Sequence, residues 1–298
     1  MIIRMTLTAI AVGLCMSGTA AAQDDDGRFL ENEGGGERID EAGRLRMLSQ
    51  RIAGAHCYHY AGVAVEDATA LLDASVADYD RILNALRSGD LGFGIVGEED
   101  DRRVVRQIDA VRAVWEPMRE RIEATQDHPT QESVRFIAAQ AEPLLREAQL
   151  LVSEVVREYS NNTDVLPSDA MRLDIAGRQR MLAQRMSKAL CIGSMDVNRE
   201  GAVAELAEAR ALYDASAKAL RFGMPEAGIL PVDDAAIAIR LDAVLADWAA
   251  VQDTIDATMD GVGMDPAAAE RMYRTFNGLT QTMDEVVAML AIRARIDL

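Results

Sequence analysis

Apolar residues recur at helical spacing over most of the chain. This pattern predicts an all-α protein with two groups of four helices. The first group is expected near residues 37–62, 66–88, 99–125 and 130–160, and the second near residues 169–197, 200–221, 233–259 and 266–295. Glycine-containing breaks, such as residues 89–92 and 260–263, separate neighbouring helices. Because the connections are short, each group is expected to fold as an up-down four-helix bundle.

The opening helices of the two groups share one sequence. The stretch IDEAGRLRMLSQRI at residues 39–52 recurs as LDIAGRQRMLAQRM at residues 173–186. The two copies start a fixed number of residues apart. Cys57 and Cys191 have the same separation in the sequence, and Trp115 and Trp248 have it to within one residue. A duplication explains all three landmarks. It predicts a first four-helix unit at 37–162 and a second at 168–298, related by an internal pseudo-two-fold axis.

The N-terminus has the features of a secretory signal peptide. Arg4 precedes an apolar stretch, and three alanines at residues 20–22 form a cleavage site of the A-x-A type. We therefore expect a signal peptide at 1–22, followed by an acidic and glycine-rich disordered leader at 23–36. No later segment has the length and hydropathy of a membrane span. The prediction is a periplasmic chain that is soluble after cleavage and does not insert directly into the membrane.

Composition and charge narrow the function classes. Aromatic residues make up 4% of the 298 residues, and the formal net charge is −18. An acidic surface repels phosphate backbones, so nucleic acid is not an expected partner. No Ser/His/Asp order, phosphate-binding glycine loop or His-Glu-x-x-His pattern is present. We therefore expect no catalytic residues, no enzymatic activity and no cofactor.

One face of each opening helix carries small and polar residues around a single arginine. In the first unit this face consists of Ile39, Ala42, Gly43, Arg46, Ser49, Gln50, Ala53 and Cys57. In the second unit it consists of Leu173, Ala176, Gly177, Arg180, Ala183, Gln184, Ser187 and Cys191. Small residues let another helix approach closely, and the natural partner is the equivalent helix of the other unit. This arrangement would place Arg46 opposite Arg180.

Two interpretations of the arginine pair follow. Facing guanidinium groups repel each other unless an anion lies between them, and their planar forks suit a planar oxyanion. Arg46 and Arg180 would then clamp one small anion, with four neighbours on the same faces: Gly43, Gln50, Gly177 and Gln184. Alternatively, each arginine pairs with an Asp or Glu of its own bundle, because the chain has 49 acidic residues.

The repeated motif resembles those of two related sensor families. Its Ala-Gly-x-x-Arg-Met core is similar to the sensor domain of nitrate/nitrite sensor kinases of the NarX type, and the fuller AGRQRMLAQRM resembles PilJ-type N-terminal domains of type IV pilus chemotaxis transducers. In the nitrate sensors, one arginine from each subunit holds nitrate at a dimer interface. By motif alignment, the resemblance implies that Arg46 and Arg180 are those arginines, and that duplication placed both halves of the site in one chain. Asp40 and Asp174 depart from the pattern, because those sensors often have Asn there.

The resemblance leads to two functional hypotheses. The first is a binding module for a small oxyanion, nitrate or nitrite by analogy, without an output domain of its own. The second is a ligand-free helical scaffold that docks on a membrane-bound signalling or transport partner. A membrane-bound signalling protein is a possible partner in both.

Cysteines and histidines support two further hypotheses. If the two opening helices pack in parallel, Cys57 faces Cys191, and an oxidising compartment would allow a disulfide. The alternative is two small buried residues. His56, Cys57 and His59 together suggest a metal site. The second unit lacks these histidines and His56 lies on the core side, so we expect no metal.

Overall fold

The computed structural model describes residues 26–159, 167–195 and 197–296. The first unit contains α1 (Asp26–Tyr60), α2 (Val65–Ser88), α3 (Arg102–Thr125) and α4 (Gln131–Tyr159), and the second contains α5 (Pro167–Ser194), α6 (Arg199–Phe222), α7 (Ala235–Met259) and α8 (Pro266–Ile296). Short 3-10 turns, η1 (Leu91–Phe93) and η3 (Pro225–Ala227), lie in the α2–α3 and α6–α7 connections. The all-α prediction is confirmed.

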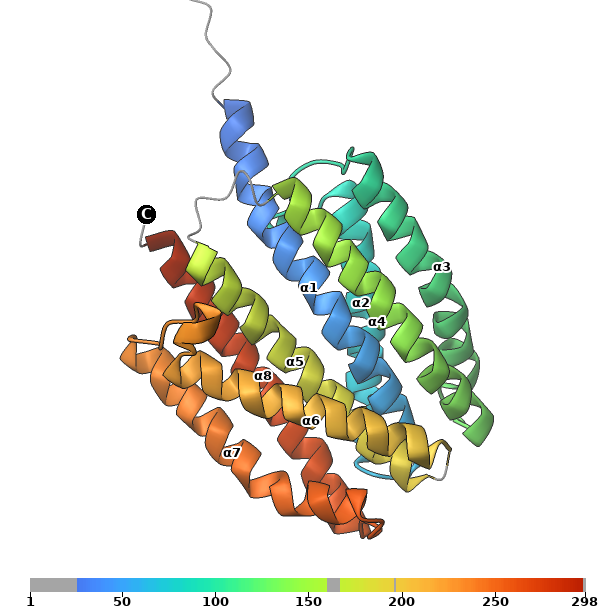
Figure 1. Cartoon of the computed structure of the whole chain (residues 1–298). Coiled ribbons are helices and arrows are strands. Elements are labelled where there is room, and N and C mark those ends of the chain that lie inside the picture. The colour runs from blue at the N-terminus through green and yellow to red at the C-terminus, as the bar shows by residue number, and fades with distance from the viewer. Residues whose placement is uncertain (1–25, 160–166, 196, 297–298) are drawn as a thin grey trace, which may run out of the picture.

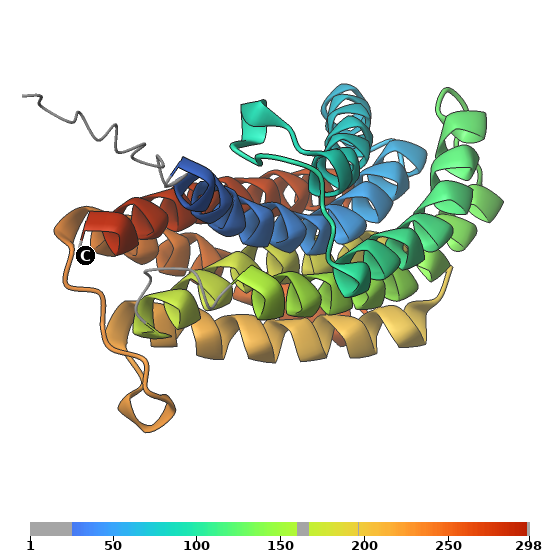
Figure 2. The ribbon, with the colours of Figure 1, turned by 90° about the horizontal axis from the view of Figure 1, so that it is seen from above.

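The two units lie side by side, with α1 and α5 in the middle of the molecule (Figure 1). Helix α1 packs against α2 and α4 of its own unit and against α5 of the other, while α5 packs against α6 and α8. Seen from above, the α2–α3 connection projects on one side of the molecule and the α6–α7 connection on the opposite side (Figure 2). This placement is what an internal pseudo-two-fold axis between the units would produce.

Each unit has its own apolar core, organised around a tyrosine and a tryptophan. The rings of Tyr79 and Trp115 lie 4.4 Å apart in the first core, and those of Tyr213 and Trp248 lie 4.6 Å apart in the second. Burying these large rings contributes strongly to the stability of a bundle. The repeated tryptophan in the sequence therefore reflects a repeated aromatic pair between α2 and α3, and between α6 and α7.

Aspartate side chains and glycines define equivalent helix ends in the two units. Asp101 caps α3 by accepting hydrogen bonds from the backbone N–H groups of Arg103 and Val104, and Asp234 caps α7 in the same way. Gly89 and Gly223 end α2 and α6 with positive φ angles of 81° in both cases. A Cβ on Gly89 would lie 2.8 Å from the carbonyl oxygen of Gly97, so no larger residue fits there without a shift of the backbone.

The N-terminal part of α1 differs from the prediction. Residues 26–36 were expected to belong to a disordered leader, but α1 begins at Asp26. Two of the glycines that suggested flexibility allow close packing instead. A Cβ on Gly34 would lie 3.3 Å from the Val96 backbone nitrogen, and one on Gly35 would lie 3.2 Å from the Tyr159 Cβ atom. The predicted signal peptide at 1–22 lies outside the described residues, and no helix within those residues is both long and apolar enough to cross a membrane.

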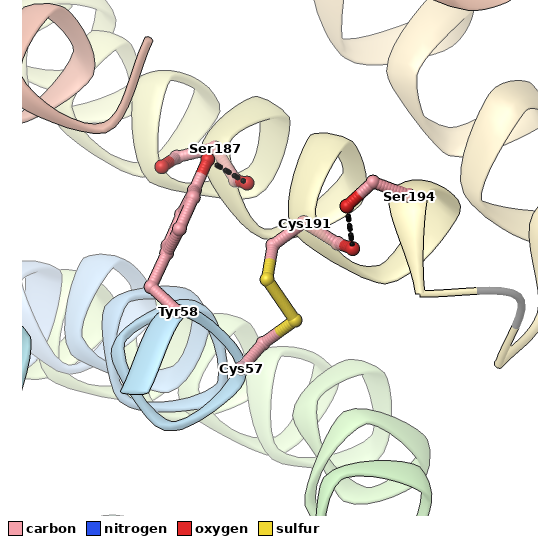
Figure 3. Close-up of a disulfide and its surroundings, with 5 residues drawn as sticks. All are labelled: Cys57, Tyr58, Ser187, Cys191 and Ser194. Carbon is pink, nitrogen blue, oxygen red and sulfur yellow. Dashed lines mark hydrogen bonds between the residues drawn. A yellow bond between two sulfur atoms is a disulfide. The ribbon is translucent and has the colours of Figure 1, made fainter. Parts of the chain in front are cut away.

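A disulfide joins the two units. Cys57 near the end of α1 bonds to Cys191 near the end of α5, with their Cα atoms 6.1 Å apart, and both side chains are buried. Next to it, the Tyr58 hydroxyl donates a hydrogen bond of 3.2 Å to the Ser187 carbonyl oxygen (Figure 3). Because the bond connects equivalent positions near the same ends of the two helices, α1 and α5 run parallel.

His56 is a buried polar side chain of the first unit. Its Nε2 atom lies 2.8 Å from the Ser133 hydroxyl on α4, and its Nδ1 atom is buried without a partner. Burial disfavours the charged imidazolium and lowers the pKa of His56 to about 4, from the ordinary value of 6.5.

Replacing both disulfide cysteines with serine should lower the free energy of unfolding by about 2–4 kcal/mol, because the bond closes a long loop in the unfolded chain. The two cysteines are 134 residues apart in the sequence. Urea denaturation of the double variant and the native chain without reductant measures the difference. Equal stability, or two free thiols in the native chain, would contradict the expectation.

Acidification should destabilise the protein through His56. Between pH 6.5 and about pH 4, the unfolded chain binds a proton at this residue that the folded chain does not, so stability falls as the pH falls. We expect the native chain to lose about 2 kcal/mol more than the His56→Gln variant between about pH 7 and about pH 5. Urea titrations at both pH values test this, and His128→Gln, in an exposed turn, should behave like the native chain. An unchanged pH dependence in His56→Gln would refute it.

Candidate anion site between the two units

The seam between the units is the contact of α1 with α5 along the faces predicted from the repeat. Small side chains permit the close approach of the two helices. A Cβ on Gly54 of α1 would lie 3.5 Å from the Lys188 Cα atom of α5. Charged side chains that project into such a seam lose most of their hydration and need partners close by.

Arg46 is buried in this seam, with a side-chain exposure of 4%. Its Nη1 atom lies 3.1 Å from the Gln149 Oε1 atom on α4 and 3.4 Å from an Asp174 carboxylate oxygen on α5. Its Nε atom donates to the Gly43 carbonyl oxygen one turn earlier in α1. Burial lowers the pKa of Arg46, and the Asp174 carboxylate partly offsets this effect.

Arg180 occupies the equivalent place on α5, with a side-chain exposure of 5%. It lies 2.8 Å from the Asp284 carboxylate of α8 and 3.2 Å from the Asp40 carboxylate of α1. Burial acts to lower the pKa of Arg180, but Asp40 and Asp284 together raise it above the ordinary value. The Nε atom of Arg180 is buried without a partner.

The two guanidinium groups converge on one glycine. A Cβ on Gly177 would lie 3.5 Å from the Arg180 Nη2 atom and 3.7 Å from the Arg46 Nη2 atom. The sequence therefore placed the arginines near each other correctly. A Cβ on Gly43, the equivalent residue, would lie near the Arg46 Nη2 atom alone. The absence of a side chain at Gly177 leaves room for both cationic groups.

An aspartate of each unit neutralises the arginine of the other unit. Asp174 of the second unit pairs with Arg46 of the first, and Asp40 of the first unit pairs with Arg180 of the second. The alternative interpretation expected carboxylates from each arginine's own bundle, and only Asp284 fits it. Asp174, Asp40 and Asp284 are 39%, 48% and 43% exposed, so the carboxylates lie at the solvent edge and the cations lie inside.

The other predicted neighbours lie apart from the arginines. Gln50 donates to the Ala141 carbonyl oxygen of α4, and Gln184 donates to Asn277 and Thr280 of α8. Both glutamines thus tie the opening helix to its own bundle. Cys57 and Cys191 form the disulfide already described, farther along the seam.

Sequence reasoning missed two residues that contact the arginines, Gln149 on α4 and Asp284 on α8. They occupy corresponding places in the two units, but one is an amide and the other a carboxylate. Because α4 and α8 show no repeated stretch, no sequence signal would have identified them.

A second ionic network crosses the same seam. Lys188 is buried, and its Nζ atom lies 2.7 Å from the Glu205 carboxylate of α6. Arg185 lies 3.0 Å from Glu205, 3.1 Å from Glu208 and 3.5 Å from Glu142 of the first unit. Burial lowers the pKa of Lys188, and Glu205 opposes this effect.

The histidine and cysteine cluster does not form a ligand set. Cys57 is in the disulfide, and His56 contacts Ser133. In the described part of the chain, no three His, Cys, Asp or Glu side chains gather where they could hold a metal ion.

Comparison with known proteins agrees with the motif. Two stretches, residues 30–142 and 162–269, match the PilJ family, described as the type IV pili methyl-accepting chemotaxis transducer N-terminal domain. No curated protein matches the chain. The matched stretches cover most of the sequence, one in each four-helix unit. The chain therefore belongs to the PilJ family of chemotaxis transducer N-terminal domains and carries two copies of that domain in tandem.

Proposed function

We propose that this chain is a periplasmic sensor-type module that binds a small planar oxyanion, of the nitrate or nitrite class, between Arg46 and Arg180. One observation carries the proposal: two almost completely buried guanidinium groups, one from each unit, converge on Gly177. Two buried like charges need anionic partners, and guanidinium forks bind planar oxyanions in a bidentate manner. The module would pass the binding event to a membrane-bound signalling partner.

The three aspartates would compete with an entering anion for the two arginines. They are the counter-ions of the arginines, and each is more than a third exposed. A half-exposed carboxylate can rotate into water at small cost, because its hydration is restored there. An entering oxyanion would thus replace Asp40 and Asp174. Its affinity would equal the free energy of its ion pairs with the arginines minus that of the aspartate pairs it displaces.

The second candidate function is a ligand-free interaction module that docks on a membrane-bound signalling or transport partner. The same crosswise ion pairs favour it, because Asp174, Asp40 and Asp284 already neutralise both arginines. In this case the cluster would serve only to fix the register of α1 against α5.

Calorimetric titration with nitrate and nitrite tests the oxyanion proposal. If the aspartates compete with the ligand, Asp40→Asn with Asp174→Asn should bind at least about tenfold more tightly than the native chain. Arg46→Lys with Arg180→Lys keeps both charges but removes the forks, so binding should be lost. Arg157→Lys, at an exposed position on α4 where the arginine pairs with Glu154, should bind like the native chain.

Circular dichroism shows whether each variant keeps its helices. If neither the native chain nor the asparagine variant binds at millimolar ligand, the clamp is refuted and the ligand-free candidate stands. Binding that survives in the folded double lysine variant would also refute it.

A further inference from the structure

Arg51 of α1 and Arg185 of α5 occupy the same place in the repeated motif. Arg185 forms ion pairs with α6 of its own unit and with α4 of the first unit. On the other side of the α1–α5 contact, an ion pair between Asp67 and Arg274 links α2 to α8. Duplication makes the surroundings of the two arginines comparable residue by residue.

Three carboxylates surround Arg185. Glu205, Glu208 and Glu142 all lie within 3.5 Å of the Arg185 guanidinium group, and Lys188 shares Glu205. Because these carboxylates neutralise its charge, Arg185 is not expected to bind a further anion.

The positions around Arg51 that are equivalent to these three carboxylates carry no carboxylate. Tyr79 and Tyr213 align α2 with α6, which puts Leu71 at the place of Glu205 and Ala74 at the place of Glu208. The arginine partners Gln149 and Asp284 align α4 with α8, and Asn277 then stands at the place of Glu142. The fourth charged residue, Lys188, corresponds to Gly54. Each of the four charged residues near Arg185 is thus matched by an uncharged residue at the equivalent position of the first unit.

Arg51 is left without a partner. Within the described residues its side chain makes no ion pair and no hydrogen bond, and its Nε atom is buried and unsatisfied. The carboxylates that reach it electrostatically, Asp284 and Asp78, are already paired with Arg180 at 2.8 Å and with Arg44 at 3.4 Å. Burial lowers the pKa of Arg51, and the nearby positive charges of Arg44 and Arg180 add to this effect.

We propose that Arg51 is a second anion site, specific for the carboxylate group of a small organic acid. The ligand's carboxylate would supply what Glu205, Glu208 and Glu142 supply to Arg185, namely the counter-charge and the hydrogen-bond acceptors. A buried N–H group without an acceptor costs free energy, so an acceptor for the Arg51 Nε–H group would relieve a cost that Arg185, whose Nε donates to Glu205, does not have. The proposal does not require an anion between Arg46 and Arg180, because neither of these arginines is needed to hold a carboxylate at Arg51.

The test is an NMR titration of the full chain with acetate, observing the arginine Nε–H resonances. We expect the Arg51 resonance to shift and saturate, with a Kd on the order of 1 mM. The Arg185 resonance serves as the internal control and should stay in place. The Arg46 and Arg180 resonances monitor the oxyanion site between the units. Failure of the proposed oxyanion binding can therefore be distinguished from failure of carboxylate binding at Arg51.

One substitution rebuilds the missing carboxylate. Ala74→Glu copies the second unit at an exposed position, and it should weaken acetate binding at least about tenfold while the helices remain intact. Ala74→Gln has almost the same size without the charge and should keep the affinity. A shift at Arg51 that does not saturate, an equal shift at Arg185, or full affinity in Ala74→Glu would each overturn the proposal.

Discussion

The close parallel contact of α1 with α5 is the constraint on which the rest of the structure depends. Small residues on both helices bring the backbones together, and each helix carries one arginine into the contact. Two buried like charges at this separation are unfavourable unless anionic groups surround them. The carboxylates of Asp40 and Asp174 cross from one unit to the other to meet this need, so electrostatics ties the units together at one end of the seam.

The disulfide acts on the same contact at its other end. Cys57 and Cys191 lie near the C-termini of α1 and α5, where Tyr58 also donates a hydrogen bond across the seam. An interface between two separate subunits would depend on protein concentration, whereas one inside a single cross-linked chain does not. In this protein the α1–α5 contact lies within one chain, and the disulfide fixes one end of it.

Duplication also frees the two halves to differ. In a symmetric dimer a change on one side appears on the other as well. Here Arg185 forms ion pairs with three carboxylates, whereas Arg51 forms no ion pair among the described residues. The partners of the seam arginines differ as well, because Gln149 serves Arg46 and Asp284 serves Arg180. The differences between the units therefore lie in how each arginine is neutralised, while the helices and cores repeat.

The sequence by itself determined the helices, the duplication and the meeting of Arg46 with Arg180, because helical periodicity and repeated motifs are local features that survive without a structure. It was wrong about residues 26–36, since glycines that suggest flexibility in a sequence also permit close packing once a neighbour such as Tyr159 is present. Only the tertiary structure decided which carboxylates pair with which arginine. Ion pairs depend on side chains brought together from α1, α4, α5 and α8, and no spacing along one helix records the charge that faces it from another.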